Sequence, residues 1–438
     1  MSIFTFKGGV HPDDGKALSK EKPIRRFIPS GEMVYPLNQH IGAPAQPIVA
    51  VGDEVLVGQK IAKAGGFVSA NIHASVSGTV KAIEPRMSMG SKVLSIVIEN
   101  DGQNKKTAYQ APDLVAGDVK KTIRNAVFEA GIVGMGGANF PTHVKLTPPD
   151  DDAIDYIIVN GAECEPYLTS DYRRMLEEPE AVIGGLKYIR MLFPKAEGII
   201  AIEDNKPDVI ELMEKMVKDI DGIRVARLKT KYPQGAERML IYALTGRKVN
   251  SSMLPLNAGC IVDNVDTVYA IYRAVKYGKP LTKRLITVTG DAVKEPMNFL
   301  VPIGSNQKDI IEAAGGFKEE PVKIISGGPM MGKAMMSLDT PVIKSSSALL
   351  CLTKDAVSDA KQTNCINCGR CLTVCPGQVA PAHLAKYAER GLKEAFVAHH
   401  GMECCECGCC SYVCPAKKNL TQSIASMRKQ VLADRKKK

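Results

Sequence analysis

Tryptophan is absent from this sequence of 438 residues, and aromatic residues together make up only 5% of it. The sequence also lacks any apolar run of about 18 residues, the length that a membrane-spanning helix needs. Its opening residues, MSIFTFKGGV, contain no apolar stretch of the kind found in signal peptides. We therefore expect a soluble, cytoplasmic protein of roughly two to four domains.

The charge balance is basic, with a formal net charge of +10. Basic residues are dispersed and lack interleaved aromatic residues, so we expect no nucleic-acid partner. Part of this excess of positive charge lies near the end of the chain, in Arg428, Lys429 and residues 435–438. A basic tail over 421–438 is typical of a solvated, disordered segment. Attraction to an anionic membrane face or to an acidic redox partner is the alternative.

Cysteine is distributed unevenly along the chain. Three of the thirteen cysteines stand alone, as buried small apolar residues often do: Cys164, Cys260 and Cys351. The other ten lie between positions 365 and 414, and eight of them form two runs with the same spacing, C-x2-C-x2-C-x3-C-P. The first run is Cys365, Cys368, Cys371 and Cys375, and the second run is Cys404, Cys407, Cys410 and Cys414.

This spacing is the ligand pattern of two-cluster bacterial ferredoxins, in which the fourth cysteine of each run reaches across to the other cluster. We therefore expect two [4Fe-4S] clusters. One cluster should be bound by the first three cysteines of the first run together with Cys414. The other cluster should be bound by the first three cysteines of the second run together with Cys375. Structural zinc is the alternative, although zinc ribbons usually present paired CxxC knuckles. Disulfides are not expected, because cysteine-dense disulfide domains are small and secreted. Cys405 and Cys409 are extra thiols inside the second run.

Two clusters would make the protein a carrier of single electrons, so the other modules should supply, receive or dock those electrons. The cluster domain is expected over 355–420. Between Cys375 and Cys404 lie 28 residues, many with a helical pattern, so this domain should be largely helical.

The remaining sequence predicts a multidomain α/β and β protein. Residues 31–100 alternate apolar and polar positions between glycine turns, which indicates short strands. They resemble the half-barrel (barrel-sandwich) of biotinyl/lipoyl carrier domains, and we place this domain, with an N-terminal tail, at 1–110. The modifiable lysine of those carriers is not evident at Ala74–Gly78, so a structural or docking role is expected instead of a swinging arm.

Two further modules follow. Over 115–278, strand-like runs alternate with amphipathic helices, which predicts a Rossmann-like layered α/β domain. Over 281–350, two strand patterns and one helix pattern suggest a small β-grasp module, with a Gly-, Met- and Ser-rich connector around 320–353.

A glycine-rich loop marks a candidate ligand site in the α/β domain. Gly134, Gly136 and Gly137 would let backbone amides approach a phosphate or a flavin edge, and Lys145 could meet a phosphate charge. The segment 160–166 ends a buried strand, where open α/β sheets place their ligands. These features point to a phosphorylated cofactor.

The phrases GMGGANFPTHVKL and YIIVNGAECEPY resemble the flavin- and NADH-binding subunit of respiratory complex I. The order of modules is half-barrel, flavin domain, soluble-ligand-binding β-grasp (SLBB) module and two-cluster ferredoxin. Together with Gln39–Pro44, that order is similar to the RnfC family, which provides one subunit of the Rnf ion-translocating electron-transport complex. The resemblance covers residues 1–420.

The resemblance implies FMN and NAD(H) as ligands and assigns residues to them. It implies Gly134, Gly136, Gly137 and Lys145 at the FMN phosphate, Asn160 and Glu163 at the flavin, Glu165 beside the nicotinamide nucleotide, and Phe140 as a stacking ring. It also implies a second loop over the flavin, with Gly235 and Glu237, and a third, asparagine-rich loop, with Asn264 and Thr267.

The sequence departs from the complex I protein at four positions. Ala162, Ala236, Asp263 and Asn139 stand where that protein has aspartate, glutamate, asparagine and glycine. These changes bear on how a nicotinamide nucleotide would lie. The complex I protein also holds one cluster on a different cysteine pattern, so its electron exit does not transfer to this chain.

The resulting hypothesis is an NAD(H)-reacting electron-transfer subunit of an Rnf-type complex. FMN would exchange a hydride with NAD(H), and the clusters would relay single electrons to or from the other Rnf subunits, coupling ferredoxin:NAD⁺ oxidoreduction to Na⁺ or H⁺ translocation. The resemblance implies a peripheral location at the cytoplasmic face of the cell membrane. A cobalamin (corrin) reductase built from related modules and a non-catalytic electron-wire or scaffold subunit are the alternatives.

Overall fold

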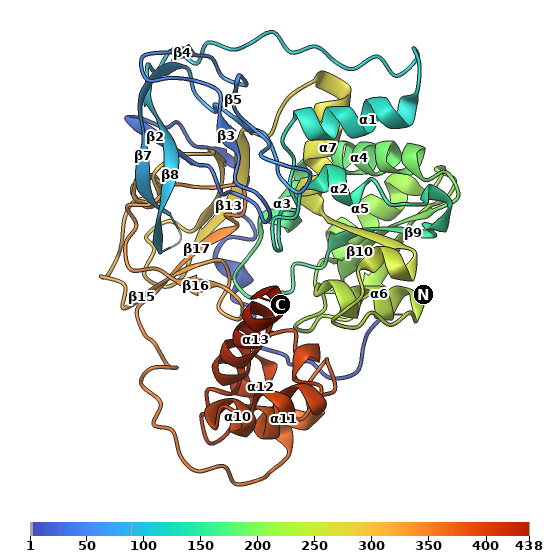
Figure 1. Cartoon of the computed structure of the whole chain (residues 1–438), viewed down its shortest axis with the longest axis vertical. Coiled ribbons are helices and arrows are strands. Elements are labelled where there is room, and N and C mark those ends of the chain that lie inside the picture. Colours follow the sequence, from blue (N-terminus) through green and yellow to red (C-terminus); the bar gives the residue numbers. More distant parts are fainter. Residues whose placement is uncertain (1–2, 89, 438) are drawn as a thin grey trace.

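The computed structural model describes residues 3–88 and 90–437. Its elements form four groups, a half-barrel, an α/β domain, a mixed sheet and a helical domain at one end of the molecule (Figure 1). Among the residues described, no helix is both long and apolar enough to span a bilayer.

The half-barrel consists of a four-stranded sheet in the order β2-β8-β7-β4 and a three-stranded sheet in the order β3-β5-β6. Alternating residues such as Met33, Tyr35, Ile96 and Ile98 are buried between the sheets, as the period-2 pattern requires. The strands are β2 (Glu32–Pro36), β3 (Gln46–Pro47), β4 (Glu54–Val55), β5 (Lys60–Lys63), β6 (Ile72–His73), β7 (Gly78–Ser88) and β8 (Ser91–Asn100).

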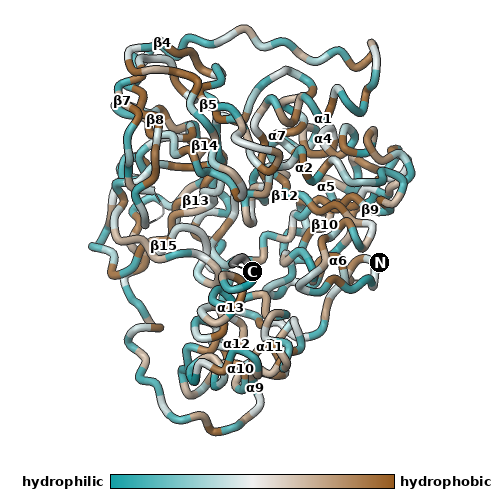
Figure 2. Tube along the Cα trace, viewed as in Figure 1, coloured by the Kyte–Doolittle hydropathy of each residue, from teal (hydrophilic) through white to brown (hydrophobic). Residues whose placement is uncertain are grey.

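The α/β domain contains a parallel sheet in the order β11-β10-β9-β12. Its central strands are continuous apolar runs, as expected for strands that are buried on both faces (Figure 2). The strands are β9 (Tyr156–Gly161), β10 (Glu197–Glu203), β11 (Ile223–Leu228) and β12 (Cys260–Asn264), and the helices are α1 (Val119–Glu129), α2 (Thr142–Lys145), α3 (Ser170–Glu177), α4 (Pro179–Leu192), α5 (Pro207–Val217), α6 (Glu237–Thr245) and α7 (Val265–Tyr277).

The third group is a six-stranded mixed sheet in the order β1-β14-β13-β17-β15-β16. The expected connector at 320–353 in fact contributes three of these strands, and the short β1 of the N-terminal segment pairs with β14. These strands have two to five residues each, too short to show a clear sequence period. The elements are β1 (Arg25–Arg26), β13 (Lys283–Thr289), β14 (Met297–Pro302), α8 (Gln307–Ala313), β15 (Lys323–Ser326), β16 (Lys333–Ala334) and β17 (Ala348–Leu352).

The C-terminal part is helical, and the prediction of a disordered basic tail is wrong for the residues described. Ile424, Met427 and Val431 recur at helical spacing and are buried against Leu384 in one core, so this segment folds as a helix. Its basic residues had suggested a solvated segment; residue 438 lies outside the described residues. The helices are α9 (Arg370–Thr373), α10 (Pro381–Glu389), α11 (Lys393–Ala398), α12 (Cys409–Tyr412) and α13 (Leu420–Lys437), with short 3-10 turns at Lys16–Leu18, Asp151–Ala153, Pro255–Ala258 and Gly401–Glu403.

Residues 3–22 form an N-terminal strap that lies on the α/β domain. Phe4 N donates to Arg227 O at 2.9 Å, and Val10 pairs with Tyr232 through two backbone hydrogen bonds. Between them, Gly9 N donates to Val374 O of the helical domain at 2.9 Å. The strap therefore joins the α/β domain to the loop that carries Cys375.

Candidate functional site

The candidate ligand site lies at the carboxyl edge of the parallel sheet. From β9 the chain continues to β10 and β11 on one side, whereas β12 pairs with the other side of β9. The strand order therefore reverses between β9 and β12, the position where open α/β sheets bind ligands. The glycine-rich loop, the ends of β9 and β12, and the loop 232–237 meet at this edge.

The glycine-rich loop packs against the start of α7. Gly136 has a φ of +105°, and a Cβ there would lie 3.2 Å from Asn264 Nδ2. Gly137 is exposed, and a Cβ there would have no neighbour within 4 Å. Met135 N donates to Thr267 Oγ1 at 2.9 Å, and Gly134 N donates to the carbonyl of the half-buried Phe140 at 2.8 Å. This leaves an open approach over Gly136 and Gly137.

The end of β9 is joined to the loop 232–237. Asn160 Nδ2 donates to Gly235 O at 2.8 Å, and Gly235 N donates to Cys164 Sγ at 3.3 Å. A Cβ at Gly235 would lie 3.3 Å from Ala162 Cβ and from both partners. Glycine is therefore the residue that lets this loop lie directly on the strand end.

Lys145 is held under the site by acidic groups. Its Nζ donates to Val262 O at 2.6 Å and to Asp263 Oδ1 at 3.1 Å, and Glu237 lies nearby. Burial alone would lower the pKa of Lys145, but the charges of Asp263 and Glu237 outweigh it and raise the pKa above its usual value. A cationic lysine therefore stands beneath the loops predicted to bind phosphate.

Unpaired polar atoms gather in the same loops. Among the described residues, buried side-chain atoms without a hydrogen-bond partner include Asn139 Oδ1, Thr142 Oγ1, both amide atoms of Gln234, and Asp263 Oδ2. Leaving such atoms unpaired is costly, so their concentration at one edge fits a ligand with many donors and acceptors. The residues present fit a flavin nucleotide.

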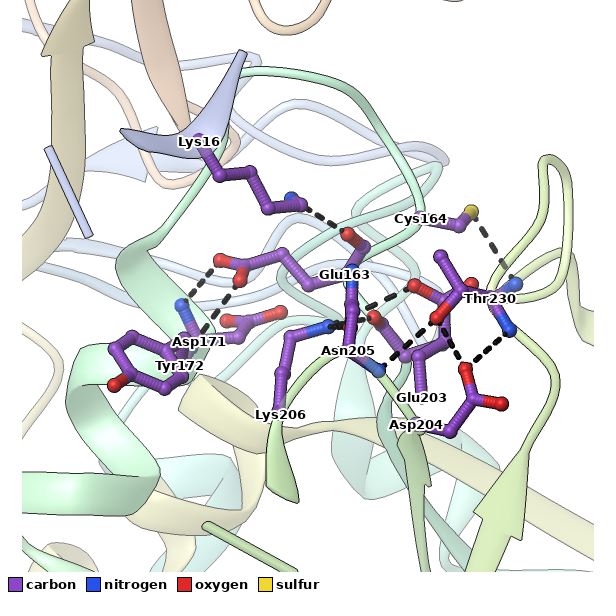
Figure 3. A network of polar contacts seen from close by, with 12 residues as sticks. Lys16, Glu163, Cys164, Asp171, Tyr172, Glu203, Asp204, Asn205, Lys206 and Thr230 are labelled. Atoms are coloured by element: carbon purple, nitrogen blue, oxygen red, sulfur yellow. Dashed lines mark hydrogen bonds and ion pairs between the residues drawn. The ribbon is translucent and has the colours of Figure 1, made fainter. Parts of the chain in front are cut away.

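Glu163, predicted at the flavin, has its carboxylate bound by backbone amides. Glu163 Oε1 accepts from Asp171 N at 2.7 Å and Oε2 from Tyr172 N at 3.3 Å, which caps the start of α3 (Figure 3). Its carbonyl accepts from Nζ of Lys16, a strap residue, at 2.9 Å. This carboxylate fixes the shape of the loop after β9.

Lys206 extends this buried network on the other side (Figure 3). Its Nζ donates to Ala162 O at 2.7 Å and lies 3.6 Å from Glu203 Oε2. Burial raises the pKa of Glu203 to about 7, although Lys206 and Lys16 oppose the shift. The two lysines thus hold the loop 162–168 from opposite sides, because Lys16 also donates to the carbonyls of Glu165 and Leu168.

Glu165, predicted beside the nicotinamide nucleotide, is bound by a loop of the mixed sheet. Its carboxylate accepts from Met330 N at 3.1 Å and from Met331 N at 2.8 Å. A Cβ at Gly328 would lie 2.2 Å from Glu165 Oε2, so glycine permits this close approach. Burial raises the pKa of Glu165 to about 6, despite these bonds.

Asn264 is part of an ionic cluster at the start of α7. Its Nδ2 donates to Asp171 Oδ2 at 2.7 Å, and its Oδ1 caps the helix by accepting from Asp266 N at 2.8 Å. Asp266 in turn is paired with two buried arginines, Arg174 and Arg284. Burial and the charges of Glu163 and Asp266 raise the pKa of Asp171 to about 7.

In the helical domain, four cysteines surround one cavity. A cavity of about 420 Å³ is lined by Cys365, Cys368, Cys371 and Cys414, the set that crossed ligation predicts for one cluster. No three His, Cys, Asp or Glu side chains of residues 3–88 and 90–437 are arranged around a single metal ion. Sulfurs distributed around a cavity suit a cube-shaped cluster better than one ion.

The second set is more buried and only partly assembled. Cys375, Cys404 and Cys410 belong to one hydrophobic core. Cys407 instead packs with Cys409 against Val10 and Tyr232 of the strap and the α/β domain. The Tyr232 hydroxyl has no hydrogen-bond partner among the described residues, and Tyr232 is 1% exposed. The second run thus lies at the junction with the α/β domain, where a cluster would meet an unpaired donor.

Several residues that shape the site were missed by sequence reasoning. Lys16, Lys206, Asp171 and Met330 lie outside every motif recognised in the sequence. Lys16 is 147 residues from Glu163, and Met330 is 165 residues from Glu165, so no local pattern connects them. For Lys206, the β10 strand end offered a signal, since polar residues at neighbouring strand ends meet at one edge.

Comparison with known proteins gives the same succession of domains. The family models that match are the RnfC barrel sandwich hybrid domain over 4–103, the Nuo51 FMN-binding domain over 127–273 and the SLBB domain over 285–334. A chain of an NAD⁺-reducing [NiFe]-hydrogenase shares the fold over 64% of this chain and 54% of its own, with 19% identity and a TM-score of 0.50. The half-barrel, α/β, β-grasp and helical architecture expected from the sequence is thereby confirmed.

The fold and the site together define the class of the protein. It is a multidomain electron-transfer protein with an FMN-binding domain and a cysteine-rich domain. The C component of the proton-translocating ferredoxin:NAD(+) oxidoreductase complex of Clostridium ljungdahlii is 50% identical over 96% of this chain and 92% of its own length. The corresponding component of the Na(+)-translocating complex of Acetobacterium woodii is 46% identical over 99% of this chain and 98% of its own length. The C component of an ion-translocating oxidoreductase complex of Rhodobacter capsulatus is 39% identical over 88% of this chain and 75% of its own length. The chain belongs to the RnfC family, the C components of these Rnf-type complexes.

Proposed function

We propose that this chain is the NAD(H)-reacting electron-transfer subunit of an Rnf-type ferredoxin:NAD⁺ oxidoreductase complex. The main support is the convergence of four loops and their unpaired polar atoms at the reversal point of the sheet. FMN, when bound, supplies the conversion between a hydride and single electrons, which two [4Fe-4S] clusters carry. The proposed complex couples this reaction to translocation of Na⁺ or H⁺, the ions named for the two relatives.

The residues of this chain bind and position the reactants. Gly136 and Gly137 admit the flavin nucleotide closely, and Lys145 supplies positive charge for its phosphate. Asn160 with Gly235, and Asn264 with Thr267, fix the loops around it. Phe140 offers a ring to a nucleotide base. Glu163 shapes the loop after β9 through its amide bonds.

Access for the nicotinamide nucleotide involves Glu165 and the loop bearing Met330 and Met331. Both carboxylate oxygens of Glu165 accept amide hydrogen bonds from this loop. For Glu165 to contact a nicotinamide nucleotide, those bonds must first break. We expect NAD(H) to displace the loop at this point.

Electrons pass between the flavin site and the surface through the helical domain. The cluster at the junction with the α/β domain would be held by Cys404, Cys407, Cys410 and Cys375. The other cluster would be held by Cys365, Cys368, Cys371 and Cys414, which line one cavity. The partners are the other Rnf subunits, including membrane-embedded ones. The proposed location of the chain is peripheral, at the cytoplasmic face of the membrane.

The test is an anaerobic reconstitution of the chain with iron, sulfide and FMN, followed by mixing with NADH. Rapid bleaching of the flavin band and then of the cluster bands is expected. Gly137→Val should abolish FMN binding without disturbing the fold, since space around its Cβ is open in the protein itself. Gly66→Val in the half-barrel is the matched control, because within 4 Å its Cβ meets only Ala43 Cβ, at 3.6 Å. Failure of FMN to bind, or a flavin that stays oxidised with NADH, would favour a non-catalytic electron wire.

A further inference from the structure

The two cysteine runs differ in their access to solvent. Cys365 and Cys368 of the first run are exposed, whereas Cys407, Cys409 and Cys410 in the second run are buried. Residues of α9 and α10 line the first-run cavity. These helices lie in the domain at the end of the molecule away from the α/β sheet (Figures 1 and 2). A cluster held by the first run would therefore be the one that a second protein can reach.

Apolar side chains stand at the mouth of this cavity. Ile366 and Leu372 line it and are 67% and 52% exposed. Both lie within the first cysteine run, between Cys365 and Cys375, so a protein that covers them is brought directly over the proposed cluster. Exposed apolar residues surrounded by polar ones are typical of protein contact sites.

Apart from the cysteine ligands, the charged side chains around the cavity have predominantly one sign. Arg370, Lys386 and Lys418 line it, and Glu389 is the single acidic residue among the described residues that do so. In the described part of the helical domain, the internal ion pairs join other residues, namely Lys393 with Asp434 and Arg428 with Glu406. Among the described residues, no ion pair neutralises these three basic groups.

Resting on the proposed function, we propose that this cavity face is the docking surface for an acidic redox protein with a one-electron centre near its surface. Such a partner is complementary to Arg370, Lys386 and Lys418, and its apolar contacts cover Ile366 and Leu372. Charge complementarity of this kind accelerates association and orients the partner, which shortens the distance between the two centres.

The test compares two double charge reversals in the full, reconstituted chain. Arg370→Glu with Lys386→Glu changes the proposed surface and spares the half-buried Lys418 beside Cys414. Lys187→Glu with Lys215→Glu makes the same change of charge at exposed helix positions of the α/β domain. Iron content and cluster absorbance establish that both proteins carry the same clusters.

The probe is an acidic plant-type [2Fe-2S] ferredoxin, whose visible spectrum is distinct. The chain is reduced with dithionite, freed of excess reductant and mixed with the oxidised probe. At low ionic strength, the surface variant should transfer electrons at least about tenfold more slowly than the control variant, and the difference should vanish at high salt. With the dication methyl viologen as acceptor, the surface variant should instead react faster than the control.

Equal rates for the two variants with the ferredoxin probe would overturn the proposal. So would a surface variant that loses binding to phosphatidylserine vesicles while its ferredoxin rate stays equal to the control, because the face would then be a membrane contact. Since dithionite supplies the electrons, the outcome does not depend on NADH. Failure of NADH to bleach the flavin would refute the proposed function and leave this test decisive for the surface.

Discussion

The two cysteine runs have the same spacing and different surroundings. In the first run, Cys365 and Cys368 are exposed beside a basic cavity mouth. In the second run, Cys407 and Cys410 are buried, and Cys407 packs against Tyr232 of the α/β domain. The motif predicts ligands for a cluster, whereas in the proposed function the surrounding domains decide which cluster faces the flavin site and which faces a partner.

The largest expected effect comes from removing one ligand from each run in turn. Cys410→Ser should cost about four iron atoms per chain and stop NADH from reducing the remaining cluster, because the junction cluster is the link to the flavin site. Cys368→Ser should cost as many irons, yet leave the second cluster reducible by NADH. Iron analysis and anaerobic spectra after NADH addition measure both results. If Cys368→Ser also blocks reduction of the second cluster by NADH, the second cluster is not the one that receives electrons directly from the flavin site.

Loss of clusters under air or chelator should also separate the runs. We expect the first-run cluster to be lost several-fold faster, because exposure governs the oxidation of cysteine ligands. The time courses can be followed by low-temperature electron paramagnetic resonance of reduced samples, with Cys368→Ser and Cys410→Ser providing the spectrum of each cluster alone. Simultaneous loss of the two signals would mean that their surroundings do not protect them differently.

The apolar face of α13 packs against the second cysteine run and should stabilise it. Ile424 is fully buried in the core that contains Cys404 and Cys410, so Ile424→Ala should destabilise the helical domain by about 2–5 kcal/mol. Leu432→Ala, at a position 43% exposed on the same helix, is the control and should change stability by less than about 0.5 kcal/mol. Denaturant unfolding, followed by circular dichroism and cluster absorbance, measures both. Equal effects would show that α13 does not pack as described.

The smallest effect is expected at Tyr232, which packs with Cys407 and Cys409 of the second run. Its hydroxyl is buried without a partner among the described residues, so Tyr232→Phe should alter folding stability by less than about 1 kcal/mol. With clusters in place, the hydroxyl should donate to a sulfur of the second cluster, and the variant should lower that cluster's reduction potential. The first cluster serves as the internal reference in a redox titration. A shift of both potentials, or of neither, would contradict this contact.

Patterns within a short stretch of sequence predicted much of the fold and the position of the ligand site. The apolar run at Ile157–Val159 predicts a buried parallel strand, which the structure contains. The spacing of Cys365 to Cys371 predicts a ligand loop. Both predictions follow from local periodicity and turn geometry.

Contacts between distant segments could not be predicted in this way. Lys16 binds the carbonyls of Glu163 and Glu165, and the amides of Met330 and Met331 bind the Glu165 carboxylate. Each depends on the packing of separate domains, which leaves no periodic signal in either segment. For α13 the periodicity was present, but its basic residues suggested a solvated tail. Charge on one face of a helix does not exclude burial of the other face.

The strap has a consequence for the order in which a newly made chain can complete its structure. It precedes every other described element, yet Phe4 pairs with Arg227, Val10 with Tyr232, and Gly9 with Val374. During synthesis Phe4 and Val10 must therefore remain without these partners until the ribosome has passed residue 232, and Gly9 must remain without its partner until the ribosome has passed residue 374. The strap can therefore join the α/β domain to the helical domain only after the first cysteine run has been made, although the strap itself is among the first residues of the chain.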